Sequence, residues 1–324
     1  MKNKKYQKLL INIIIAVVIY AVVMMAIQFG WIGRQLLSMI VPVCTNIMLA
    51  VSLCLIVGFL GELTLGHAAF MSVGAYSGAL VTLNAPLPSW LALALGLVVG
   101  GITAALAGVI IGVPVLRLRG DYLAIVTLGF GEIIKSIFNT IGITGGASGL
   151  SGIPMLTTYR NFTLVFILMV IVIIVVANLV KSRQGRAICA IRDNYIAAEA
   201  AGIKVSKYKV MAFVISAFFA GVAGVVYAHN ISILKPGNFD YNQSIEFLVM
   251  VVLGGMGSIR GSIIAATILT LLPEVLRGVA DYRMLVYSIV LIAMMLFNNS
   301  KLKARLFARR NIGKAAAAQG KGAR

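Results

Sequence analysis

Long runs of apolar residues, separated by short polar stretches, make up most of this chain. Ten apolar segments can be distinguished, at residues 9–29, 36–60, 66–83, 90–116, 121–141, 162–180, 210–232, 245–256, 261–276 and 283–297. Because about 20 apolar residues span the hydrocarbon core of a membrane as a helix, most of these segments predict transmembrane helices. The pattern therefore predicts an all-α fold, a polytopic integral membrane helical bundle of about 8–10 transmembrane helices.

The segment at 245–256 differs from the others because it is short. Its 12 residues are too few to cross a membrane as a straight helix. We predict that it is half of a broken or re-entrant element. The break would lie in GGMGSIRG at 254–261 and would include Gly254 and Gly255, which become candidates for a transport pathway.

Composition and charge agree with a membrane protein and give its orientation. Apolar residues make up 60% of the 324 residues and charged residues 11%, whereas a soluble domain has about 25% charged residues. Most of the 28 Lys and Arg residues lie before residue 9, at 117 and 119, in 181–209 and in 301–324. Basic residues near span ends stay in the cytoplasm, so both termini are predicted to be cytoplasmic. The net charge of +19 thus indicates topology and not a nucleic acid-binding surface.

Small residues recur at four-residue spacing in several segments. The pattern occurs at Gly74 and Gly78, at Gly257 and Gly261, and in the fourth segment at Gly100, Ala104, Gly108 and Gly112. This spacing places small residues on one helix face, where two backbones can approach closely. We predict tight packing between helices and no binding role for these glycines.

Ionisable residues inside the predicted spans are candidates for the transport pathway. Glu62, Glu132 and Glu246 lie within or at the ends of spans, and Lys135 follows Glu132 at a spacing that favours an ion pair on one helix face. Glu62 and Glu246 have the alternative of a headgroup location, whereas the Glu132–Lys135 pair, deeper in its segment, is expected to lie in the interior. His67 is a further candidate, although a lone histidine at a helix start is more often a hydrogen-bonded structural residue. With two histidines and neither an HExxH motif nor a cysteine cluster, the sequence predicts no metal site.

The glycine-rich stretch at 144–152 predicts irregular backbone on the outer side of the membrane. Gly145, Gly146 and Ser148 lie in it, as an ordinary turn, a flexible outer gate or a surface that meets a partner. Ser148 and Ser151 also match a G-x-S-G pattern, which with His229 as base would suggest an intramembrane serine enzyme. Two overlapping matches in a Gly- and Ser-rich loop are better explained by composition.

The loop at 181–209 is the longest polar stretch between spans. Within it, 186–201 predicts an amphipathic helix with an apolar stripe of Ile188, Ile191, Tyr195 and Ala198, flanked by Arg192 and Glu199. Such a helix would lie on the membrane or dock into a groove of another protein. The stripe is small and lacks the large anchors of interfacial helices, which favours docking.

Five stretches together resemble a known family, the LivM-type permease subunit of branched-chain amino-acid ABC importers. They are GELTLGHAAFMSVGAYSGAL (61–80), RLRGDYLAIVTLGFGEI (117–133), TGGASGLSGIP (144–154), GRAICAIRDNYIAAEAAGI (185–203) and VVLGGMGSIRGS (251–262). The apolar and charge patterns predict a first span with a basic cytoplasmic N-terminus at 1–35 and a basic, disordered cytoplasmic tail at 301–324, and the resemblance implies a permease core at 36–300. It also implies an ATPase-coupling loop that contains Arg192, Asp193, Tyr195, Ala198, Glu199 and Gly202.

The same resemblance implies the partners and the location of the protein. The partners are a sister permease, two ATP-binding subunits and an extracytoplasmic substrate-binding protein, in the cell membrane of a prokaryote. The chain itself has no G-x-x-x-x-G-K-[ST] phosphate loop, so ATP would be used by partner subunits and this chain would need no cofactor. We expect a transporter that works by alternating access and is not an enzyme.

Two alternatives to a branched-chain amino-acid importer stay open at this stage. Related permeases carry urea, short amides or aromatic amino acids. An ion-coupled secondary transporter would need no partner, and Glu132 or Glu246 would carry its proton.

Overall fold

The computed structural model describes residues 14, 17–29, 33–118, 120–276, 288, 289 and 292. Within them the chain is helical except for short connections and one pair of two-residue strands. The elements are α2 (Arg34–Cys54), η1 (Leu55–Leu60), α3 (His67–Asn84), α4 (Ser89–Val115), α5 (Asp121–Thr140), η2 (Gly142–Thr144), η3 (Gly146–Ser148), β1 (Leu150–Ser151), η4 (Tyr159–Asn161), α6 (Phe162–Lys181), α7 (Arg183–Asp193), α8 (Tyr195–Ala200), α9 (Val205–Ala228), β2 (Ile233–Leu234), η5 (Pro236–Phe239), α10 (Tyr241–Gly254) and α11 (Ile259–Val275).

These helices confirm the predicted polytopic helical fold. Five described helices are long and apolar enough to cross a membrane, at Gln35–Leu60, Ser89–Val115, Asp121–Thr140, Tyr159–Lys181 and Val205–Ala228. A shorter apolar helix, Val17–Gln28, corresponds to the first predicted segment. The last predicted segment, 283–297, and the tail at 301–324 lie almost entirely outside the described residues.

The chain divides into two compact units, Met1–Leu271 and Leu272–Arg324. The first unit holds the helical bundle. The described part of the second unit consists of the last residues of α11 and four further residues, Leu276, Ser288, Ile289 and Ile292.

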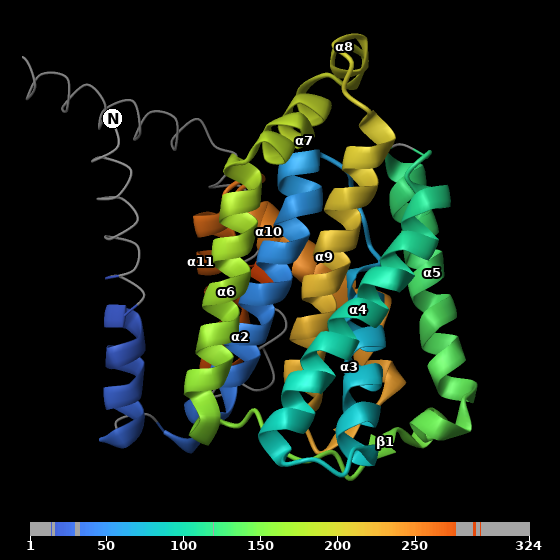
Figure 1. The fold of residues 1–324 in the computed structure, drawn as a ribbon. Coiled ribbons are helices and arrows are strands. Elements are labelled where there is room, and N and C mark those ends of the chain that lie inside the picture. The colour runs from blue at the N-terminus through green and yellow to red at the C-terminus, as the bar shows by residue number, and fades with distance from the viewer. Residues whose placement is uncertain are drawn as a thin grey trace, which may run out of the picture. The chain divides into compact units, whose positions relative to one another are not determined.

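Helices α3, α4 and α9 form the tightest part of the bundle because glycines line their contacts. A Cβ atom added at Gly221 of α9 would collide with the Cβ of Ala104 and the carbonyl of Gly100 on α4, and one added at Gly74 of α3 would collide with the backbone of Gly221. The prediction that the four-residue glycine pattern serves helix packing is confirmed. Figure 1 shows these three helices side by side in the middle of the bundle.

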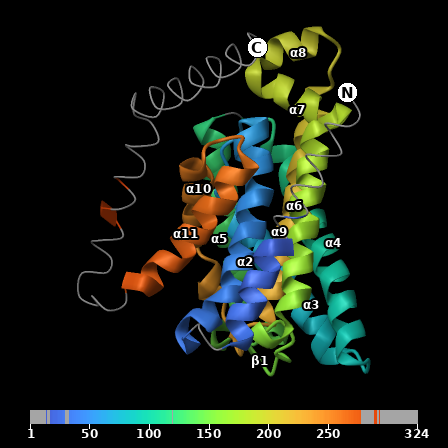
Figure 2. The same ribbon diagram turned by 90° about the vertical axis from the view of Figure 1, so that its left-hand side faces the viewer.

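The bundle has two different ends. Helices α7 and α8 lie at one end, and β1, which pairs antiparallel with β2, lies at the other (Figures 1 and 2). Helix α2 runs between them against α6, α9 and α10. The charge pattern predicts that the α7–α8 end lies in the cytoplasm.

Two helices begin inside the bundle and not at its ends. Helix α2 closes in the π-helical turn η1, residues 61–66 carry no helix, and α3 begins only at His67. Helix α10 has 14 residues. It begins after η5 and ends at a break at 255–258, which separates it from α11. Helix α3 lies toward the β1 end and α10 toward the α7 end (Figures 1 and 2), so their first turns meet between the two ends.

Candidate functional site

A small polar hollow lies where the first turns of α3 and α10 meet one face of α5. It is shallow, without room for a water molecule, and is lined by Leu65, Ala69, Leu128, Gly131, Glu132, Phe239, Asp240, Tyr241 and Ser244. The Ser244 hydroxyl accepts a 3.1 Å hydrogen bond from the Ala68 amide, which ties the two helix starts together. The Leu65 amide donates to Thr127 Oγ1 of α5 over 3.0 Å. Three elements distant in sequence therefore fix the geometry of the hollow.

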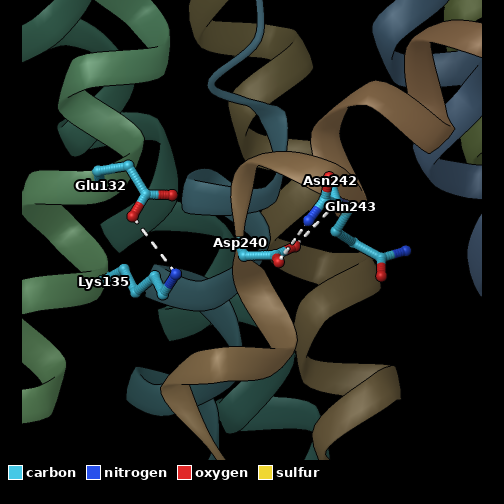
Figure 3. Close-up of polar contacts among 5 residues, drawn as sticks. All are labelled: Glu132, Lys135, Asp240, Asn242 and Gln243. Carbon is cyan, nitrogen blue, oxygen red and sulfur yellow. Dashed lines mark hydrogen bonds and ion pairs between the residues drawn. The ribbon is translucent and has the colours of Figure 1, made fainter.

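Charged side chains face this hollow from α5 and from the start of α10. Lys135 donates to Glu132 over 3.3 Å, which confirms the predicted ion pair. Asp240 caps α10 by accepting from the Gln243 amide and also accepts from the Asn242 side chain. Figure 3 shows Glu132 and Lys135 extending from α5 toward the start of α10.

The Glu132–Lys135 pair is not buried within this chain. The side chains of Glu132 and Lys135 are 40% and 25% exposed, so the expectation of an interior location is wrong for the chain by itself. Charged groups at membrane depth do not face hydrocarbon but a water-filled path or another protein. We therefore expect the exposed face of α5 and α10 to be covered by one of these.

The other predicted pathway residues lie at different places in the bundle, and none of them lines the hollow. His67 is buried at the start of α3, and its Nε2 lies 2.9 Å from the Ser52 hydroxyl, as expected for a structural histidine. Glu246 is exposed one turn into α10, near Gln243. Gly254 packs against the Gly261 backbone at the break between α10 and α11, and Gly255 has a positive φ there. Neither glycine lines the hollow.

The glycine-rich loop forms the end of the bundle that carries β1. Its backbone is irregular as predicted, with positive φ at Gly145, Gly146 and Gly149. Ser148 is exposed in η3, and Leu150 of β1 pairs with Leu234 of β2. The loop is thus an ordered surface at the opposite end from α7.

His229 offers no support for a serine enzyme. Its side chain is buried, with Nε2 2.9 Å from the Thr82 hydroxyl and Nδ1 2.8 Å from the Val225 carbonyl. Both ring nitrogens therefore have partners other than Ser148 and Ser151. Among the described residues no group of three His, Cys, Asp or Glu side chains is arranged to hold a metal ion.

The 181–209 loop folds into two short helices, so the prediction of one helix over 186–201 is wrong. Asn194 separates α7 from α8, and its side chain caps α8 by accepting from the Ala197 amide over 3.0 Å. Asn and Asp favour such caps because their side chains satisfy free amides at a helix start.

The apolar stripe of this loop packs against the chain itself. Ile188, Ile191 and Ala198 are 0%, 4% and 5% exposed, and α7 contacts α6, α9 and η1. The stripe is therefore not available for docking, contrary to the prediction. The face of α8 that is accessible carries Ile196, which is 62% exposed, together with Glu199. Gly202 follows in a turn with positive φ.

The end of η1 is held by two contacts that the sequence did not reveal. Arg192 Nη1 donates to the Gly58 carbonyl over 3.2 Å, and its Nε and Nη2 both donate to Asp193. Glu62 forms a buried ion pair with Lys209 of α9. Lys209 was missed because it directly precedes an apolar run and looks like an ordinary flanking lysine. Glu62 is thus paired and not in contact with headgroups.

Comparison with known proteins identifies related transport proteins. A family described as the permease component of branched-chain amino acid transport systems matches residues 35–297. The high-affinity branched-chain amino acid transport permease LivM of Salmonella typhimurium is 34% identical over 314 residues, which cover 86% of this chain and 73% of that protein, and LivM of Escherichia coli K12 matches to the same extent. The permease LivH of Salmonella typhimurium is 26% identical over 76% of this chain and 86% of LivH. No solved structure gives a significant match.

Proposed function

Because the chain belongs to the family of branched-chain amino acid transport permeases, we propose that it is a membrane-spanning subunit of an ATP-driven importer for branched-chain amino acids. It would act by alternating access in the cell membrane of a prokaryote. The observation that carries this proposal is that two helices begin inside the bundle and meet at a polar hollow, which would open during transport. Discontinuous helices of this kind form substrate sites at the middle of the membrane in transporters.

The hollow offers groups for each part of an amino-acid zwitterion. The first turn of α3 lies at the hollow, and the dipole at a helix N-terminus favours anions such as a carboxylate. Glu132 and Asp240 would attract the ammonium group, and Leu65, Leu128 and Phe239 would contact the side chain. An apolar pocket separates leucine, isoleucine and valine by only about 1–3 kcal/mol. Strict selectivity would therefore reside in an extracytoplasmic binding protein.

Other surfaces of the chain suit the proposed partners. The half-exposed charges on α5 and the start of α10 would face a sister permease across the substrate path. The β1 end, where Ile143 and Met155 are 75% and 51% exposed, would meet the binding protein. Since the sequence has no phosphate loop, two ATP-binding subunits would supply the energy.

The ATP-binding subunits would dock on α8. Ile196 is a large apolar side chain at the tip of a polar loop, and Ala197 and Ala200 beside it are also exposed. A short helix with one apolar anchor fits a hydrophobic groove on a partner. The buried stripe behind it would keep α8 fixed to the bundle.

Reconstitution tests the proposal against the ion-coupled alternative. The chain, a sister permease and two ATP-binding subunits are placed in proteoliposomes with binding protein, and uptake of radiolabelled leucine is measured. We expect uptake only with ATP. Equal uptake without the ATP-binding subunits, driven by an ion gradient, would replace the importer with a secondary transporter. ATP-dependent uptake of urea or short amides but not leucine would correct the substrate.

The pathway assignment has its own test on α5. Glu132→Gln should lower leucine uptake about tenfold, the effect of losing one charge-assisted contact. The thermal stability of the subunit should barely change, because a half-exposed ion pair contributes less than about 1 kcal/mol. Ile133→Ala, on the same helix and 54% exposed, is the control and should transport normally. Normal uptake in Glu132→Gln would remove Glu132 from the pathway.

A further inference from the structure

Residues 58–62, at the end of η1, are contacted from two sides by charged side chains of α7 and α9. On one side the guanidinium of Arg192, at the end of α7, donates to the Gly58 carbonyl over 3.2 Å. On the other side Lys209, near the start of α9, pairs with Glu62, and both side chains are almost fully buried. Helix α8 lies in the chain between these two contacts. Any displacement of α7, α8 and the start of α9 therefore acts on residues 58–62 at both points.

Glycines provide the space in which the Arg192 side chain lies. A Cβ at Gly61 would lie 2.6 Å from Arg192 Cγ, and a Cβ at Gly257 would lie 3.4 Å from Arg192 Nη1 and 3.2 Å from the Gly58 carbonyl oxygen. Gly61 and Gly257 also have φ angles of +79°, which L side chains rarely adopt. The arginine thus fits beside the two breaks in the bundle, at 61–66 and at 255–258.

The charge of Arg192 suits this position. The last carbonyls of a helix lack partners within the helix and carry a partial negative charge. Arg192 satisfies one of them at Gly58 while Asp193 accepts its other two donors at 3.0 and 2.8 Å. Asp193 therefore orients the guanidinium toward the end of η1.

The break at 61–66 leads directly to the hollow, and the length of α10 connects the break at 255–258 to it. Residues 61–66 connect the end of η1 to the start of α3, and Leu65 among them lines the hollow. The break at 255–258 follows α10, whose first turn contributes Ser244 to the same hollow. A shift at residues 58–62 would consequently move the start of α3 through residues 61–66, and the start of α10 through the length of that helix.

We propose that Arg192 is a positioning residue that transmits movement of α7 and α8 to the starts of α3 and α10. This inference rests on the proposed function, because the movement would come from ATP-binding subunits docked on α8. The Glu62–Lys209 pair is the second point of attachment. Together the two contacts transmit a displacement of α7 and α8 to the helix starts at the hollow.

The test uses the complete importer in proteoliposomes and the variant Arg192→Gln. We expect the ATP-binding subunits to copurify as in the wild type and the leucine transported per ATP hydrolysed to fall about tenfold, as for the loss of a charged hydrogen bond. Arg192→Lys, which keeps a cationic donor, should restore the larger part of this ratio. Arg183→Gln, an exposed arginine at the start of α7, should leave the ratio unchanged.

Amide hydrogen exchange supplies a readout that does not depend on transport. In the purified full-length chain, peptides that cover residues 61–66 should exchange faster in Arg192→Gln than in the wild type or Arg183→Gln. In the complete importer, the wild type should show an ATP-dependent change in these peptides that Arg192→Gln lacks.

The outcomes separate this inference from the proposed function. A wild-type ratio in Arg192→Gln, unchanged exchange at 61–66, or loss of the ATP-binding subunits from the complex would each overturn the role of Arg192. Absence of ATP-dependent leucine uptake in the wild type would instead contradict the proposed function, and the exchange of the isolated chain would still decide whether Arg192 holds residues 61–66.

Discussion

Lys209 on α9 forms an ion pair with Glu62, although the two residues are separated by 147 positions in the chain. Their side chains are only 7% and 12% exposed. Two long charged side chains are buried at such a place only when each neutralises the other. The pair therefore fixes the start of α9 to the segment that leads into α3.

Removing one member of this pair should destabilise the protein more than removing both. Lys209→Met leaves Glu62 buried without its partner and should cost about 3 kcal/mol, the lower end of the range for a broken buried pair. The double variant Glu62→Gln with Lys209→Met should recover most of this loss. Thermal unfolding in detergent measures it, with the exposed Lys207→Met as control. Equal stability of the single and double variants would show that the pair is solvated.

Two nearby substitutions on α8 should affect different properties of the subunit, one its binding to the ATP-binding subunits and the other its stability. Ile196→Asp changes an exposed side chain, so the subunit should stay stable but lose copurification with the ATP-binding subunits. Ala198→Asp places a charge where the side chain is 5% exposed, and burying an unpaired charge costs several kcal/mol. It should therefore lower the melting temperature of the isolated subunit. If Ile196→Asp binds its partners normally, the docking surface lies elsewhere.

A pair of glycines tests the packing of the bundle. Gly221→Ala would bring a Cβ against Gly100 and Ala104, so it should cost about 1–3 kcal/mol, as overpacked cores do. Gly129→Ala on α5 meets nothing within 4 Å and should gain about 0.5–1 kcal/mol, because alanine favours a helix. Thermal unfolding of both variants measures these changes. An unchanged stability of Gly221→Ala would show that α4 and α9 can move apart at little cost in free energy.

Labelling in intact cells tests the orientation derived from charge. Cysteines are introduced singly at Ile196 and at Ala147, which are exposed at opposite ends of the bundle, after replacement of Cys189. Because basic residues stay cytoplasmic, an impermeant thiol reagent should modify only Ala147→Cys. Modification of Ile196→Cys under these conditions would reverse the topology.

The apolar segments could be predicted from the sequence because a helix is the only way for one segment to satisfy its own backbone in a membrane. The start of α3 at His67 and the short α10 followed from the same pattern. The Glu132–Lys135 pair was predictable because its members are three residues apart on one helix. Each of these inferences needed only local sequence.

The contacts of Arg192 and Lys209 could not be predicted, since their partners lie far away in the sequence. The stripe on α7 and α8 shows a second limit. A periodic apolar face indicates that the face is buried but not what buries it, and here the partner is the chain itself. Docking on another protein and packing on the same chain produce the same pattern.

The packing of α9 between α3 and α4 also has a consequence for biosynthesis. Helix α9 is made long after α4, and a ribosome that adds roughly 5–20 residues per second needs on the order of 5–20 s to reach its end. During that interval the glycine positions of α3 and α4 that later receive α9 lack this helix as a partner. A nascent chain halted before Val205 therefore cannot form the contacts that α9 makes with α3 and α4.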